Sequence, residues 1–119
     1  MPARKNKEEE EIVREWGVKL AEEIESYTMS GLTPIKTGHL EDALREAGIV
    51  LSMAGEKDLA LRAEELSRKA LEARHIMKAT RAITASVEKV RLDAQRFAVD
   101  MKRRMNKKLH VDAANPLNP

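Results

Sequence analysis

The chain has 119 residues, of which 42% are hydrophobic and 35% charged, with a formal net charge of +2 and no cysteine. This length fits one domain, and the lack of cysteine excludes disulfides, thiolate metal sites and cysteine nucleophiles. No apolar run approaches the roughly 20 residues that cross a bilayer, and the charged start lacks a signal-peptide core, so we expect a soluble, cytoplasmic protein without membrane contact.

The composition favours an all-α fold. Only one Trp, one Tyr and one Phe are present, so the core must be rich in Ala, Leu and Met, which suit helices better than sheets. Gly and Pro interrupt helices, and neither occurs from Glu56 to Asn115. We therefore expect a three- to four-helix bundle, a single helical domain over residues 1–109.

The first helix is predicted over about residues 7–30. Asn6 and Glu9 have the spacing of a capping box, and Glu10 with Arg14, four residues apart, should form an exposed ion pair. The apolar residues recur at steps of three and four and form one stripe: Val13, Trp16, Leu20, Ile24 and Tyr27.

The second and third helices are predicted over residues 38–54 and 57–79. Thr37 can cap the second helix, and Gly55 can end it in a left-handed conformation. The connection between them is so short that they should run antiparallel, as a central helical hairpin. The spacing of Gly48, Leu51, Gly55 and Ala60 resembles a tetratricopeptide-type repeat, but Glu64 stands where that repeat has a large apolar residue.

A fourth helix is predicted over residues 84–108. The apolar positions alternate by four and three from Leu59 onward, and this phase breaks between Thr80 and Ile83. Thr84 or Ser86 could cap a new helix there. The alternative is one long helix over residues 57–108, stabilised by a partner chain. Residues 110–119 contain Asn and Pro and are predicted to form a flexible tail.

The two halves of the chain have opposite charges. Residues 1–59 hold 8 basic and 13 acidic residues, a net charge of −5, whereas residues 60–119 hold 14 and 7, a net charge of +7. The last helix should present a basic face, because several cations fall on or beside one line along it. These candidate contacts for nucleic acid or an acidic partner are Lys89, Arg96, Arg103, Arg104, Lys107 and Lys108.

Candidate interface residues lie on other faces. Leu92 and Val99 are seven residues apart on the side of the last helix opposite its main stripe, and Trp16 and Tyr27 could anchor an interface as well as a core.

Catalytic signals are few. Glu72 and His75 have the Glu-x-x-His spacing of helical di-iron sites, and they are weak candidates for metal ligands; the alternative is an exposed pair. No triad spacing or Gly-rich phosphate loop occurs, so we expect no enzyme and no cofactor.

The sequence therefore predicts a helical protein-interaction or assembly module that associates with itself or with another protein. Its oppositely charged halves would set the orientation of the partner. The alternative is an accessory protein that binds nucleic acid through the basic face of the last helix.

Overall fold

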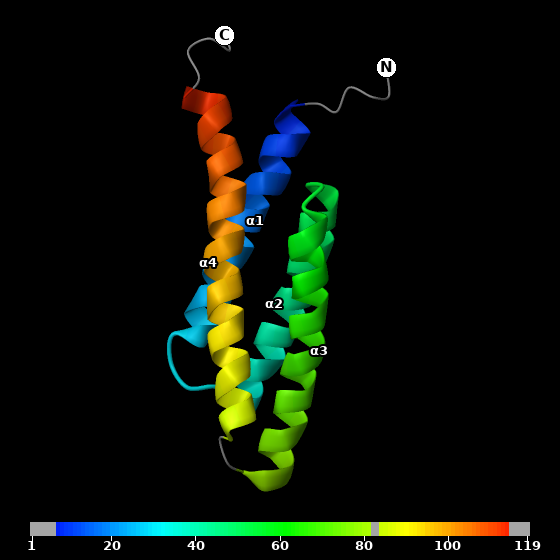
Figure 1. The fold of residues 1–119 in the computed structure, drawn as a ribbon, viewed down its shortest axis with the longest axis vertical. Helices are drawn as coiled ribbons and strands as arrows, with labels where there is room; N and C mark the ends of the chain where they lie inside the picture. The colour runs from blue at the N-terminus through cyan, green and yellow to red at the C-terminus, as the bar shows by residue number, and fades with distance from the viewer. Residues whose placement is uncertain (1–6, 82–83, 115–119) are drawn as a thin grey trace.

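The protein is a bundle of four helices, as a computed structural model shows (Figure 1). The structure describes residues 7–81 and 84–114, and the side chains as far as Asn106. The helices are α1 (Lys7–Thr28), α2 (Pro34–Met53), α3 (Lys57–Thr80) and α4 (Ala85–Ala114). The prediction of an all-α bundle built around a helical hairpin is confirmed.

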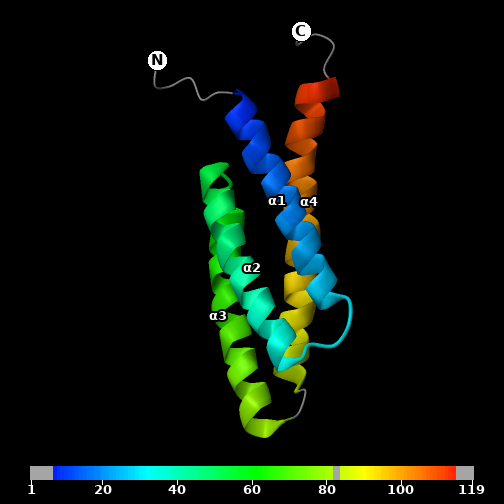
Figure 2. The same ribbon diagram turned by 180° about the vertical axis from the view of Figure 1, so that it is seen from behind.

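The helices form a ring in the order of the chain. The most extensive contacts join α2 to α3 and α1 to α4, and smaller ones join α1 to α2 and α3 to α4. Within the described residues the backbones of the diagonal pairs do not come close to each other. The molecule measures 57 × 27 × 19 Å. The start of α1 and the end of α4 extend beyond the turn between α2 and α3 (Figures 1 and 2).

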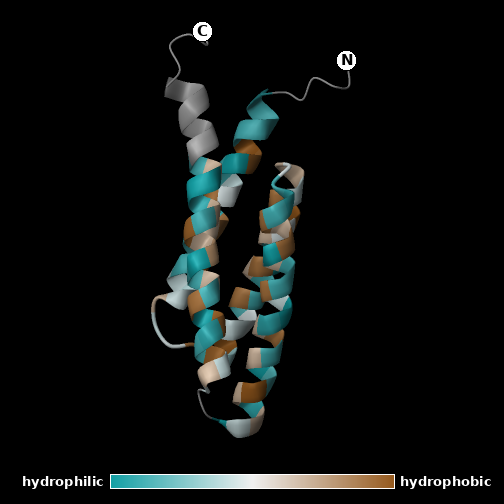
Figure 3. Cartoon of the chain, viewed as in Figure 1, coloured by the Kyte–Doolittle hydropathy of each residue, from teal (hydrophilic) through white to brown (hydrophobic). Residues whose placement is uncertain are grey.

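The core is built mainly from small and aliphatic side chains, as the composition predicted. Alanines at the helix contacts let the backbones approach closely, and the largest fully buried side chain is Phe97. Hydrophobic and hydrophilic residues alternate along the helices (Figure 3). The fully or almost fully buried residues include Ile24, Leu40, Leu44, Ala47, Leu51, Leu59, Ala63, Ala70, Ala94, Phe97 and Met101.

The second helix begins earlier than predicted. Thr33 caps it, since the Thr33 side chain accepts a hydrogen bond from the Lys36 N–H at 3.1 Å, and Pro34 suits the first turn because it lacks an N–H that would need a partner. Thr37, the predicted cap, is buried one turn inside the helix, where its hydroxyl donates to the Thr33 carbonyl at 2.6 Å.

The predicted break after Thr80 is present. Arg81 adopts a left-handed conformation (φ 55°) and donates its N–H to the Met77 carbonyl, and the Thr84 hydroxyl accepts a hydrogen bond from the Val87 N–H at 3.3 Å. Two helices thus occupy the region where one long helix was the alternative.

The fourth helix continues to Ala114, beyond the predicted end at residue 108. Residues 115–119 of the predicted tail lie outside the described residues. None of the helices, as far as the chain is described, combines the length and hydropathy needed to cross a membrane.

Candidate interaction surfaces

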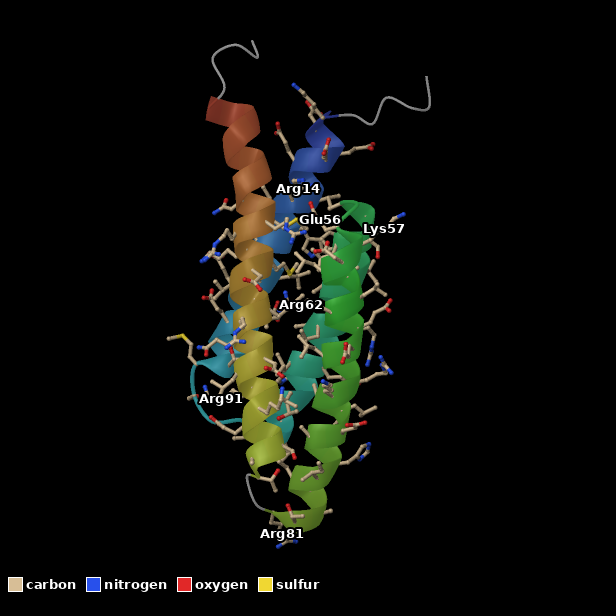
Figure 4. The ribbon with its side chains drawn as sticks, viewed as in Figure 1. Arg14, Glu56, Lys57, Arg62, Arg81 and Arg91 are labelled. Atoms are coloured by element: carbon tan, nitrogen blue, oxygen red, sulfur yellow. The ribbon has the colours of Figure 1, made fainter. Side chains whose placement is uncertain are left out.

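A buried arginine lies where the start of α1 meets α4 and the α2–α3 turn. Arg14 is 3% exposed, and its Nη2 donates to Glu56 Oε2 at 3.1 Å and to the Ala54 carbonyl at 3.3 Å. Its Nη1 lies 3.6 Å from Met105 Sδ. Figure 4 shows Arg14 and Glu56 close together at this end of the bundle. The prediction of an exposed Glu10–Arg14 pair is wrong, because Arg14 faces the helices packed against α1.

Glu56 joins two arginines from different helices. Arg104 Nη1 donates to Glu56 Oε1 at 2.9 Å and to Asp58 Oδ1 at 3.0 Å. Burial raises the pKa of Glu56, but the hydrogen bonds from Arg104 and Arg14 outweigh burial and lower it below its usual value. This network connects α1, the α2–α3 turn and α4.

An open, largely apolar groove lies beside this network, between the start of α1 and the end of α2. It has a volume of about 610 Å³. Ile12 (62% exposed), Trp16 (40%) and Met53 (46%) line it, and Glu9 and Glu10 supply acidic groups. Ile49, also exposed, stands four residues before Met53 on the same face of α2. We call the residues that line this pocket the α1–α2 groove. The full lining is Glu9, Glu10, Ile12, Val13, Trp16, Ser52, Met53, Ala54 and Gly55.

Several cations of α4 are paired within the chain. Lys102 lies 3.2 Å from Glu22 and 3.8 Å from Glu25 of α1, and Lys89 donates to Asp93 at 2.8 Å. Lys89 and Arg104 belong to the predicted basic face, so their ion pairs neutralise part of it.

Two arginines help to hold α4 against its neighbours. Arg91 pairs with Glu88 and donates to the Thr28 carbonyl at the end of α1 at 2.9 Å. Arg62 of α3 donates to Asp100 at 3.0 Å and lies 5.5 Å from the centre of the Phe97 ring. Both side chains are labelled in Figure 4. These contacts serve the packing of the bundle.

Two predicted cations remain free for a partner. Arg96 and Arg103 are exposed and make no ion pair with any residue that the structure describes. Leu92 (47% exposed) and Val99 (37%) lie on the same side of α4, because the steps from 92 to 96, 99 and 103 follow the period of a helix. We call these four residues the outer stripe of α4. The side chains of Lys107 and Lys108 lie outside the described part of the chain.

Tyr27 contributes to packing between α1 and α2. Its hydroxyl donates to Glu23 Oε1 at 2.8 Å, and its ring stacks on His39 with the ring centres 5.9 Å apart. The hydrogen bond with Glu23 and burial raise the pKa of Tyr27. Tyr27 is only partly exposed, so Trp16 is the more accessible of the two predicted aromatic anchors.

The structure does not gather further ligands around Glu72 and His75. Both side chains are exposed on α3, and the described residues contain no group of three or more His, Asp or Glu side chains that could hold a metal ion.

Comparisons with protein-family models, with curated proteins and with solved structures gave no match to this chain. The function is therefore inferred from the chemistry of the surfaces, and the α1–α2 groove and the outer stripe of α4 each combine exposed apolar side chains with charges that have no ion pair among the described residues.

Proposed function

We propose that this protein is a helical assembly module that associates with copies of itself through exposed apolar faces of its helices. The observation that carries the proposal is the exposure of Ile12, Trp16 and Met53 in one groove, with exposed Ile49 one turn before Met53 on α2. None of these side chains belongs to the buried core of the described residues. Large apolar side chains gathered at one place on a surface are typical of an interaction site.

Burial of such a surface would stabilise a complex. Removing apolar area from water is favourable by about 25 cal/mol per Å², and Trp is among the residues that contribute most to interfaces. Glu9 and Glu10 at the groove and Arg96 and Arg103 on α4 add charges that would select and orient the partner.

The test compares two double variants of the same composition. Ile12→Ser with Met53→Ser removes apolar surface from the groove, while Ile35→Ser with Met29→Ser removes even more exposed side chains that do not line it. We expect the groove variant to raise the dissociation constant of self-association at least tenfold, about 1.4 kcal/mol, and the control variant to change it little.

Sedimentation velocity and light scattering at several protein concentrations provide the measurement, with circular dichroism to verify that each variant stays helical. A wild-type chain that remains monomeric at high micromolar concentration would contradict self-association. Equal effects of the two double variants would show that the groove is not the interface.

A second candidate function is nucleic-acid binding, which the unpaired Arg96 and Arg103 favour. Against it, Lys102 and Arg104 are paired with acidic residues, and Phe97, the aromatic residue of α4, is fully buried and offers no stacking surface. Fluorescence anisotropy of labelled DNA and RNA, titrated with the protein, tests whether it binds nucleic acid. Binding that weakens steeply with salt and is lost in Arg96→Glu with Arg103→Glu would support this candidate, and no binding at low salt would exclude it.

A further inference from the structure

We infer that the occupant of the α1–α2 groove is the outer stripe of α4 from a second copy of this chain. The inference rests on the proposed self-association and names the two surfaces that meet. It follows from the charges, the apolar residues and the geometry of both surfaces.

The charges of the two surfaces are complementary. Glu9 and Glu10 line the groove and make no ion pair with a described residue. Glu46, exposed on α2 three residues before Ile49, adds a negative charge on the same face of that helix. The outer stripe carries Arg96 and Arg103, which likewise have no acidic partner among the described residues. Docking would therefore pair charges that the described part of each chain leaves unpaired.

The apolar residues of the groove and of the outer stripe extend over similar lengths. Leu92 and Val99 are seven residues apart, about 10 Å along a helix at 1.5 Å per residue. The α1 side of the groove extends over the same number of residues, from Glu9 to Trp16. A helix that presents apolar residues at this spacing is the usual ligand of an apolar groove.

Symmetric pairing of either surface is disfavoured. Two grooves face to face would bring Glu9 and Glu10 of both copies together, and two outer stripes would bring Arg96 and Arg103 together. Like charges in an interface are unfavourable. A chain also cannot fill its own groove with its outer stripe, because α4 packs against α1 with its opposite, apolar side.

The association is therefore head to tail between different surfaces. Such an arrangement forms closed rings or open chains, according to whether the rotation between neighbours closes. The average mass should then pass beyond that of a dimer as the concentration rises.

A charge-reversal experiment tests this arrangement. The groove variant carries Glu9→Lys and Glu10→Lys, and the stripe variant carries Arg96→Glu and Arg103→Glu. Each variant alone has two surfaces of like charge, so we expect its self-association to weaken at least tenfold. In an equimolar mixture each reversed surface meets its opposite, and association should return to within about threefold of the wild type, a difference of under 1 kcal/mol.

A fluorescence measurement and a control variant test whether the effect comes from these two surfaces. Trp16 is the only tryptophan of the chain and lies in the groove, so its emission should shift to shorter wavelength when the groove is covered, in the wild type and in the mixture. A control with Arg68→Glu and Lys78→Glu reverses two exposed cations of α3, and it should associate like the wild type.

Three results would overturn the inference. If the wild type associates and both reversed variants associate equally well, the interface lies elsewhere and the proposed function stands without this partner. If each variant loses association but the mixture does not regain it, the two surfaces do not meet. A monomeric wild type would overturn the proposed function together with the inference.

Discussion

At the scale of single residues, Arg14 is the residue whose structural role differs most from the role that its sequence neighbours predict. A cation four residues after Glu10 is typical of an exposed ion pair on a helix. Instead, Arg14 is buried against Glu56, the Ala54 carbonyl and Met105. Gly17 lies on the same side of α1, and a Cβ there would stand 2.6 Å from Met105 Cε. The absence of a side chain at position 17 thus gives Met105 room beside Arg14.

Replacement of Arg14 should destabilise the protein to a degree that depends on the new side chain. We expect Arg14→Ala to lower the free energy of unfolding by about 3 kcal/mol, because it removes hydrogen bonds to a charged partner and leaves a cavity. Arg14→Met fills much of that volume, and Glu56 keeps its contact with Arg104, so we expect a loss of about half as much.

Urea denaturation followed by circular dichroism gives both values. Equal losses in the two Arg14 variants would mean that the charge, and not the filled volume, determines the effect. No loss in either variant would contradict a stabilising role for the network.

At the scale of elements, the α2–α3 hairpin depends on two glycines in different conformations. Gly55 has a φ of +78° and ends α2, and the Glu56 N–H that follows donates to the Leu51 carbonyl at 2.9 Å, as in a Schellman motif. Gly48 lies inside α2, where an added Cβ would be 3.6 to 3.7 Å from Glu64, Ala60 and Ala63 of α3. That separation is ordinary van der Waals contact.

The two glycines should respond to alanine with opposite signs. Gly48→Ala should raise the free energy of unfolding by up to about 1 kcal/mol, because alanine favours a helix and its methyl group fits against α3. Gly55→Ala should lower it by about 1 to 2 kcal/mol, because the left-handed conformation is unfavourable for a residue with a Cβ. Thermal and urea unfolding measure the change in the free energy of unfolding of each variant. A destabilised Gly48→Ala variant would indicate that the helices cannot accommodate one methyl group.

At the scale of the whole molecule, part of the opposite charge of the two halves is paired inside the bundle. Glu22 and Glu25 of α1 pair with Lys102, and Glu56 and Asp58 pair with Arg104. The acidic first half and the basic last helix therefore stabilise the ring of helices. Among the described charges that this pairing leaves unpaired are Glu9 and Glu10 at the groove and Arg96 and Arg103 on the outer stripe.

Stability should consequently fall in acid. The pKa of Glu56 is lower in the folded protein than its usual value. The stabilisation that the ionised Glu56 gives the fold is therefore fully present above its unfolded pKa of about 4.3. It is lost as the pH falls through the lower, folded pKa. The hydrogen bond from Arg104 lowers the pKa of Asp58 as well. Asp58 should therefore also lower the free energy of unfolding as the pH falls.

The measurement is the free energy of unfolding between pH 7 and pH 3 for the wild type and for Glu56→Gln. We expect the variant to be less stable at pH 7 and to lose less stability on acidification. Parallel curves for the two proteins would assign the acid sensitivity to other carboxyl groups.

The sequence by itself determined the helices and the hairpin, because these depend on near neighbours. Gly55 as a stop, the break between Thr80 and Thr84, and the alanine-rich seam all follow from spacings of a few residues. The start of α2 was misplaced because Thr33 and Thr37 both have the chemistry of a cap, and only the position of the first turn distinguishes them.

Only the tertiary structure decided which charged and apolar groups are left for a partner. The ion pair of Arg14 with Glu56 joins residues 42 positions apart, and that of Arg104 with Glu56 joins residues 48 apart. Helical periodicity tells which side chains share a face, but the helix that lies against that face is set by the packing of the whole chain. For this reason the basic face was visible in the sequence, whereas the pairing of Lys102 and Arg104 and the groove at Trp16 were not.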